Sequence, residues 1–269
     1  MKFLEKSKTA IKVWKNFGSV EIVMLLFRKY QGRGSGQSLK IQSHQNFLSS
    51  VKFSYPNLQF LNDCDLDKAD LSDVEMYKEY LHRRELKFEL SRTGFFDQIY
   101  DLGPGLSLIL FHLLLKTCPN KIIETGVAAG ASSNIILYCL DINKNGALIS
   151  VDITPNVGEL IEDNLKPKWD LNILPNLSKK KGFINLLQQN SDASIFLHDS
   201  DHSIQWQKFE IKAAIESLPK LEYLLVDDVT DELNDYVINN LPNWKLLVID
   251  EGRKYSGFMV RDLVIRNVG

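Results

Sequence analysis

IIETGVAAGASS, residues 122–133, joins an apolar strand, a turn of small residues and the start of a helix without a gap. Small residues let the backbone pass close to a ligand, and the first turn of a helix offers unpaired N–H groups to an anion. A second apolar run, residues 147–152, ends in Asp152, and an acid at that position accepts hydrogen bonds from ribose hydroxyls. Together the two runs predict a site for an adenosine-containing ligand. The alternative is a tight β-to-α turn beside a surface aspartate.

From residue 95 onward, apolar runs alternate with helical segments, which is typical of a doubly wound parallel sheet. We expect an α/β fold: a Rossmann-like, mainly parallel seven-stranded sheet with an antiparallel last strand. The connection before the last strand is too short for a right-handed crossover, so that strand must run antiparallel. Strands are expected at residues 121–124, 147–152, 171–174, 194–198, 223–227, 244–249 and 257–264, and helices from Pro104 to Lys116 and over 204–217.

The first part of the chain has a different composition, and we expect two regions. Residues 1–94 are interpreted as an N-terminal helical cap region, and residues 95–269 as the main domain. The basic N-terminal stretch has no apolar run near the ~20 residues that a spanning helix needs. We therefore expect no transmembrane segment, with a helix lying on a membrane surface as the alternative.

Charge and cysteine content narrow the function classes. The net charge of −2 argues against a nucleic-acid binder that works by bulk electrostatics. Three widely spaced cysteines without a Cys-x-x-Cys motif favour reduced thiols and a cytoplasmic protein.

Two further apolar runs end in acids: IFLHDSD, residues 195–201, and YLLVDD, residues 223–228. Ligands of open α/β sheets sit outside the carboxyl ends of the strands, so these acids should meet at one edge. Two unit charges about 4 Å apart interact by roughly 4 kcal/mol at an effective dielectric of 20. The acids therefore require either that some stay protonated or that a cation lies among them.

Glu124, Gly126 and Gly130 fit an acid-x-Gly-x-x-x-Gly pattern, and with Asp152 they resemble the class I S-adenosylmethionine-dependent methyltransferases. The likeness covers about residues 97–261. The acid motifs after 198 and 226 are similar to the branch of macrocin and aminocoumarin-sugar O-methyltransferases and cephalosporin-hydroxylase-like proteins. This resemblance implies methyl transfer from S-adenosyl-L-methionine to a hydroxyl of a small molecule or glycan precursor. The cofactor-binding residues that it implies are Glu124, Thr125, Gly126, Ala128, Gly130, Ser132, Asp152 and Asp199.

The same resemblance implies a divalent cation, usually Mg²⁺, held by Asp199, Asp227 and Asp228. Asp201 is then the candidate general base, with His202 as a second acid–base group. Alternatives stay open for these side chains. Asp201 or Ser203 can cap the helix over 204–217, and the acid pair at 227–228 can cap the next helix or lie in a solvated loop.

Other functions remain as alternatives. One is a methyltransferase without metal that uses Asp201 or His202 as base, and another is a catalytically silent binding protein. A third is an NAD-dependent oxidoreductase, although Gly126, Ala128 and Ala131 match its glycine pattern poorly. A hydroxylase-like activity is a fourth, and relatives that pair through N-terminal segments leave a homo-oligomer open. The connection 252–257 is expected to be a solvated hairpin tip that could present Arg253 or Lys254 to an acidic substrate.

Overall fold

The computed structural model describes residues 76, 77, 79–81, 96, 101–174, 180–251 and 254–262. All of them belong to one compact unit of the chain, His44–Gly269. The helical cap expected over 1–94 lies outside the described residues except at the few positions just given, so the boundary at residue 94 stays a prediction. Within the described part of the chain, no helix combines the length and apolar character needed to cross a bilayer.

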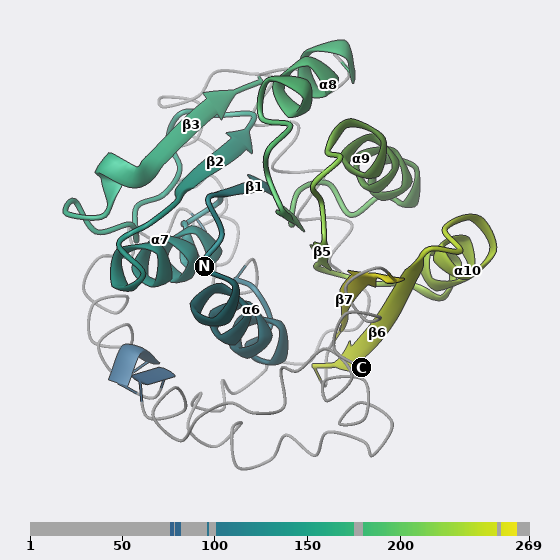
Figure 1. The fold of residues 1–269 in the computed structure, drawn as a ribbon, viewed down its shortest axis with the longest axis horizontal. Helices are drawn as coiled ribbons and strands as arrows, with labels where there is room; N and C mark the ends of the chain where they lie inside the picture. Colours follow the sequence, from purple (N-terminus) through teal and green to yellow (C-terminus); the bar gives the residue numbers. More distant parts are fainter. Residues whose placement is uncertain are drawn as a thin grey trace, which may run out of the picture. The chain divides into compact units, whose positions relative to one another are not determined.

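The described strands form one mixed sheet in the order β3-β2-β1-β4-β5-β7-β6 (Figure 1). Strand β7 lies antiparallel to both of its neighbours, and the other pairs are parallel. This confirms the predicted fold class. The strands are β1 (Lys121–Thr125), β2 (Ala147–Asp152), β3 (Trp169–Ile173), β4 (Ile195–His198), β5 (Tyr223–Val226), β6 (Trp244–Asp250) and β7 (Tyr255–Arg261).

Helices cover both faces of the sheet (Figure 1). They are α6 (Pro104–Thr117), α7 (Ala131–Ile142), α8 (Lys180–Gln189), α9 (Ile204–Ser217) and α10 (Asp231–Asn240). Helices α6 and α7 pack together on one face, whereas α9 lies between α8 and α10 on the other. The helix predicted over 204–217 has these bounds in the structure, and α6 ends one residue beyond its predicted end.

Neighbouring residues of the central strands alternate between two apolar clusters, because successive side chains of a strand point to opposite faces. In β1, Ile122 faces the α6/α7 cluster and Ile123 faces the α8/α9/α10 cluster. The first cluster also contains Tyr77 and Tyr80, and the Tyr80 hydroxyl donates to Asn134 Oδ1 of α7 at 3.1 Å. Aromatic residues from the predicted cap region thus complete one side of the core.

The start of α6 is held by a residue 145 positions later in the chain. Glu251, buried at the end of β6, accepts hydrogen bonds from the backbone N–H groups of Gly105 (2.9 Å) and Leu106 (2.8 Å). A carboxylate at a helix N-terminus satisfies free N–H groups and complements the helix dipole. A Cβ at Gly103 would lie 2.5 Å from the Glu251 carboxyl group, so the small residue lets the carboxylate approach.

Replacing Glu251 by glutamine should lower the free energy of unfolding by about 1–3 kcal/mol. The amide keeps one oxygen, and its NH₂ group faces an N–H donor that loses its acceptor. Urea unfolding followed by circular dichroism measures the loss, with the exposed Glu222→Gln as control, which should stay within about 0.5 kcal/mol of the unchanged chain. Equal stabilities of the two variants would contradict the capping role.

Candidate functional site

The turn after β1 has left-handed backbone conformations at three positions. The φ angles are 81° at Gly126, 49° at Ala128 and 88° at Gly130. A Cβ at Gly126 would lie 1.9 Å from the carbonyl oxygen of Asp199, so the turn touches the loop after β4. The glycine turn and the first acid motif therefore lie together at the carboxyl edge of the sheet.

A buried carboxylate holds the residues on either side of this turn by hydrogen bonds. Glu124 is fully buried and accepts hydrogen bonds from the hydroxyls of Ser132 (2.6 Å), Ser133 (2.6 Å) and Ser150 (2.8 Å). Burial raises the pKa of Glu124, and the three hydroxyls partly oppose that shift. Glu124 and Ser132 thus fix the start of α7 against β1 and β2, and Glu124 has no exposed surface with which to touch a ligand.

Asp152 ends β2 next to the same turn. Its Oδ2 accepts from the N–H of Val127 at 2.9 Å, and its Oδ1 accepts from the N–H groups of Ile153 (2.6 Å) and Thr154 (3.2 Å). A carboxylate has about four acceptor positions. Three are used in the described chain, which leaves one on Oδ2 for a hydroxyl donor.

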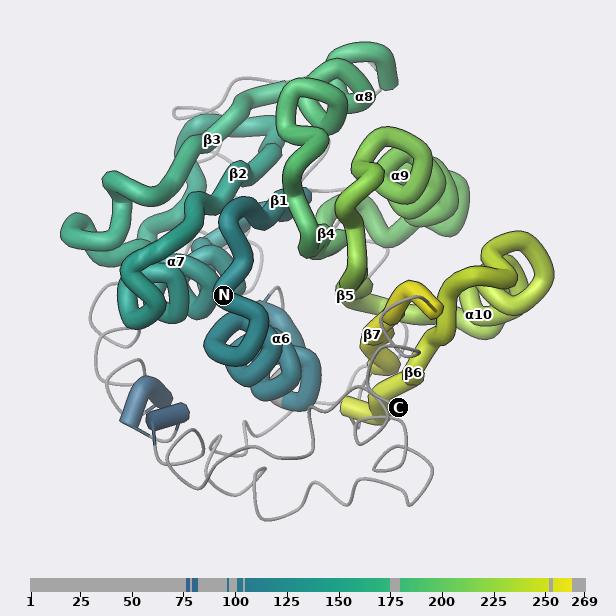
Figure 2. Tube along the Cα trace, in the orientation of Figure 1, coloured from purple at the N-terminus to yellow at the C-terminus, as the bar shows by residue number. Residues whose placement is uncertain are grey.

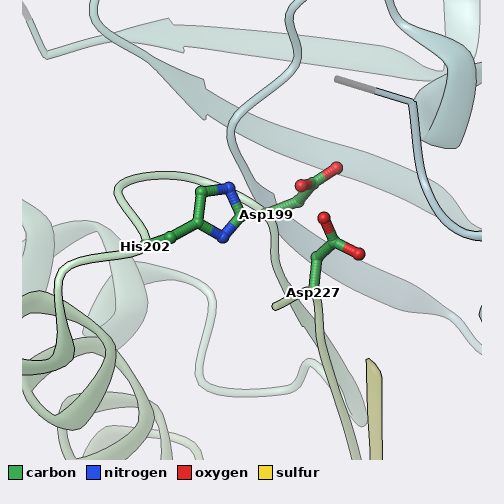
Figure 3. A group of neighbouring side chains, drawn as sticks. All are labelled: Asp199, His202 and Asp227. Carbon is green, nitrogen blue, oxygen red and sulfur yellow. The ribbon is translucent and has the colours of Figure 1, made fainter. Parts of the chain in front are cut away.

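Three side chains after β4 and β5 face one another (Figure 3). Asp199, His202 and Asp227 each bring a ligand atom within 4.8 Å of the other two. Figure 2 shows that β4 and β5, whose ends carry these loops, run side by side. Burial raises the pKa of Asp199 well above its usual range, and the neighbouring charge of Asp227 raises it further.

Asp228 is not one of these three but contacts one of them. Its Oδ2 lies 3.2 Å from His202 Nδ1, and its backbone is left-handed, with a φ angle of 57°. Asp201 is not among the three either, and its Oδ1 accepts a hydrogen bond from the N–H of Ser203 at 2.8 Å. Ser203 stands at the N-cap of α9 but makes no capping bond with its side chain. Of the two capping candidates, Asp201 therefore supplies the side-chain oxygen.

A lysine lies among the acids. Lys254 Nζ is bonded to Asp227 Oδ2 and lies 3.8 Å from Asp228 Oδ1. Its side chain is 22% exposed, so the prediction of a solvated hairpin tip is wrong for this residue. The chain itself thus supplies a cation to the cluster, which is one of the two solutions that the acid motifs required.

Glu210, a fully buried acid in α9, was not among the predicted site residues. Its carboxylate accepts from the Thr125 hydroxyl (2.7 Å), the Trp206 indole N–H (2.6 Å) and the Ser200 hydroxyl (3.0 and 3.1 Å). His198 Nδ1 lies 2.5 Å from Glu210 Oε2. Glu210 therefore ties the ends of β1 and β4 to α9, and it bonds the residues on both sides of Asp199, His198 and Ser200.

Gln207, one turn before Glu210, holds the second acid motif. It is fully buried, and its Nε2 donates to the backbone carbonyl oxygens of Asp228 (2.9 Å) and Asp227 (3.3 Å). The sequence contains one signal for both residues: positions 207, 210, 211 and 214 share one helix face, which includes the buried Ile211 and Ala214. A glutamine and a glutamate on an apolar face indicate polar partners in the interior.

No protein-family model and no curated protein matches the chain. Among solved structures, the S-adenosylhomocysteine-bound methyltransferase PaMTH1 of Podospora anserina matches with a TM-score of 0.50 and 12% identity, over 85% of this chain and 100% of that one. A methyltransferase from Geobacter sulfurreducens matches with the same TM-score and identity, over 84% of this chain and 99% of that one. At this level of identity the likeness concerns the fold: the chain has the Rossmann-like fold of these two methyltransferases.

Proposed function

We propose that this protein transfers a methyl group from S-adenosyl-L-methionine to a hydroxyl group of a small molecule or glycan precursor. One observation carries the proposal: the contact between Gly126 and Asp199 joins the glycine turn and the acid cluster at one edge of the sheet. A cofactor on the turn and an acceptor on the acids would then be neighbours. The fold shared with the S-adenosylhomocysteine-bound PaMTH1 supports this interpretation.

The cofactor side of the proposal uses the turn and Asp152. Gly126, Ala128 and Gly130, where the backbone is left-handed, carry no side chain or only a methyl group, so a ligand can approach the turn closely. The acceptor position on Asp152 Oδ2 that no described residue uses suits a ribose hydroxyl. Glu124, Thr125 and Ser132 would position the glycine turn and not touch the cofactor, because each is buried and hydrogen-bonded within the protein.

The acceptor side of the proposal uses the acid cluster. A hydroxyl is a poor nucleophile until it loses its proton, and a positioned base typically contributes about 10²–10⁴-fold to the rate. The imidazole of His202 faces Asp199 and Asp227, whereas Asp201 holds a backbone N–H with one of its oxygens. For transfer without metal we therefore favour His202 over Asp201 as the base, and with His202 bound to a metal the second oxygen of Asp201 would take that role.

A divalent cation fits the donor set of Asp199, His202 and Asp227, whose ligand atoms are close enough to share one ion. When bound, such a cation would lower the pKa of the acceptor hydroxyl. Mg²⁺ prefers oxygen ligands, and an imidazole in the set also suits Mn²⁺. Asp228, paired with His202, would orient that ring rather than bind the ion directly.

Metal-independent transfer is the second candidate, and the position of Lys254 favours it. The ammonium already supplies positive charge to the acids, and His202 remains as a base. An NAD-dependent oxidoreductase and a silent binding protein are further alternatives. Cofactor titration distinguishes the NAD-dependent oxidoreductase from a methyltransferase. An activity assay distinguishes the silent binding protein from an enzyme.

Calorimetric titration with S-adenosylhomocysteine tests the cofactor site. We expect the unchanged chain to bind it and NAD⁺ to give no heat, and Asp152→Asn to weaken S-adenosylhomocysteine binding about 10-fold or more. Asp170→Asn, an exposed acid on β3, is the matched control and should bind like the unchanged chain. Absence of binding at millimolar S-adenosylhomocysteine would remove the cofactor assignment.

The remaining parts of the proposal concern the location of the protein, its N-terminal region and its oligomeric state. We propose a cytoplasmic location, which agrees with the free thiols of Cys118 and Cys139. A helical cap over residues 1–94 and assembly into a homo-oligomer also remain proposals. Size-exclusion chromatography with light scattering tests the oligomeric state, and limited proteolysis tests the boundary near residue 94.

A further inference from the structure

The ammonium of Lys254 is bonded to Asp227, one of the three residues proposed to hold a divalent cation. Asp227 is only 3% exposed, and its Oδ2 is bonded to Lys254 Nζ. Its Oδ1 accepts a hydrogen bond from the Ser256 hydroxyl at 3.4 Å. Both oxygens of Asp227 therefore have partners from the β6–β7 hairpin.

The surroundings of Lys254 keep it charged and close to the acids. Burial by itself lowers the pKa of the ammonium, but Asp227, Asp199 and Asp228 outweigh this and raise it above its ordinary value. A buried charge is costly unless it is paired, so Lys254 and Asp227 stabilise each other. A second cation at the same acids would be repelled by the ammonium and would have to take Asp227 away from it.

We propose that the Lys254 ammonium and a divalent cation compete for the same acids, so that this lysine sets the metal affinity of the site. The inference deepens the metal-assisted form of the proposed function and rests on it. Metal binding requires the ammonium to leave Asp227, and the position of the 254–256 segment then depends on whether metal is present. A neutral side chain at position 254 frees Asp227 for metal.

Mn²⁺ binding to the full-length chain tests this, measured by the electron paramagnetic resonance signal of free Mn²⁺. We expect Lys254→Met to bind Mn²⁺ about 10- to 100-fold more tightly than the unchanged chain. Lys208→Met is the matched control, because Lys208 Nζ is paired with the exposed Glu232 at 2.9 Å and not with Asp227. It should bind like the unchanged chain, and adding Asp227→Asn to Lys254→Met should abolish the gain. Equal or weaker binding by Lys254→Met would overturn the proposal.

A measurement on the unchanged protein covers the case in which Lys254→Met does not fold. Acylation of lysines, read by mass spectrometry, should be faster at Lys254 in saturating Mn²⁺ than without it, while Lys208 serves as internal reference. Unchanged labelling of Lys254 would overturn the competition. Titration of the same samples with S-adenosylhomocysteine keeps the two ideas apart, since cofactor binding can succeed or fail whatever the metal result.

Discussion

Gly126→Ala is expected to prevent the chain from reaching its native structure. The new Cβ would lie 1.9 Å from the carbonyl oxygen of Asp199 and 2.8 Å from Ser200 Cα, and both are backbone atoms that cannot rotate away. The φ angle of 81° adds strain, because side chains with a Cβ rarely adopt left-handed backbone. The two effects together should cost more than about 4 kcal/mol, a large share of the stability of an ordinary domain. Urea unfolding or the yield of folded protein measures the loss.

Glycine to alanine at another position serves as the control, and there the expected change in stability is zero or positive. Gly182 lies in α8, and the nearest atom to an added Cβ is Leu174 Cδ2 at 3.9 Å. Alanine favours a helix over glycine by about 1 kcal/mol, so Gly182→Ala should leave stability unchanged or raise it. If the free energies of unfolding of Gly126→Ala and Gly182→Ala differ by less than about 1 kcal/mol, the turn does not touch the loop after β4. The proposed function would then lose the contact on which it depends.

Local sequence patterns predicted the elements of the sheet. Strand β2 has its predicted bounds, and β4 begins one residue later than expected, because both are short apolar runs followed by acids. The antiparallel β7 followed from the length of one connection. The acids at the ends of β4 and β5 could be placed at one edge because parallel strands share a direction.

The electrostatic partners of the acids could not be predicted in the same way. Lys254 lies in a stretch with the composition of an exposed hairpin, and only the pairing of β7 with β5 brings it to Asp227. Glu210 lies 85 positions from Thr125 in the chain, so no local pattern connects them. Long-range pairing of charged and polar side chains depends on how the helices pack on the sheet. The sequence identified the acids, whereas the charges that balance them required the structure.

Glu210→Gln should lower the free energy of unfolding by about 3–5 kcal/mol, because one buried carboxylate accepts hydrogen bonds from four side chains. The glutamine keeps the shape but has only one accepting oxygen, and its NH₂ group faces donors. Some of the hydroxyl, indole and imidazole donors around it therefore stay buried without an acceptor. The ends of β1 and β4 should loosen together, and the loop that carries Asp199 lies directly after one of them.

Glu216→Gln provides the matched comparison, since it is the same substitution two turns later in α9. Glu216 is 64% exposed and its Oε1 lies 3.7 Å from Lys212 Nζ, so its loss should change stability by less than about 0.5 kcal/mol. A double-mutant cycle with Thr125→Val isolates the link between α9 and β1, and a coupling energy near zero would mean that the two residues act independently.

Metal affinity distinguishes an effect of Glu210→Gln on the loop after β4 from a loss of global stability. If Glu210 positions the loop after β4, the folded fraction of Glu210→Gln should also bind Mn²⁺ more weakly than Glu216→Gln does, because Asp199 and His202 would no longer be held at the spacing that one ion requires.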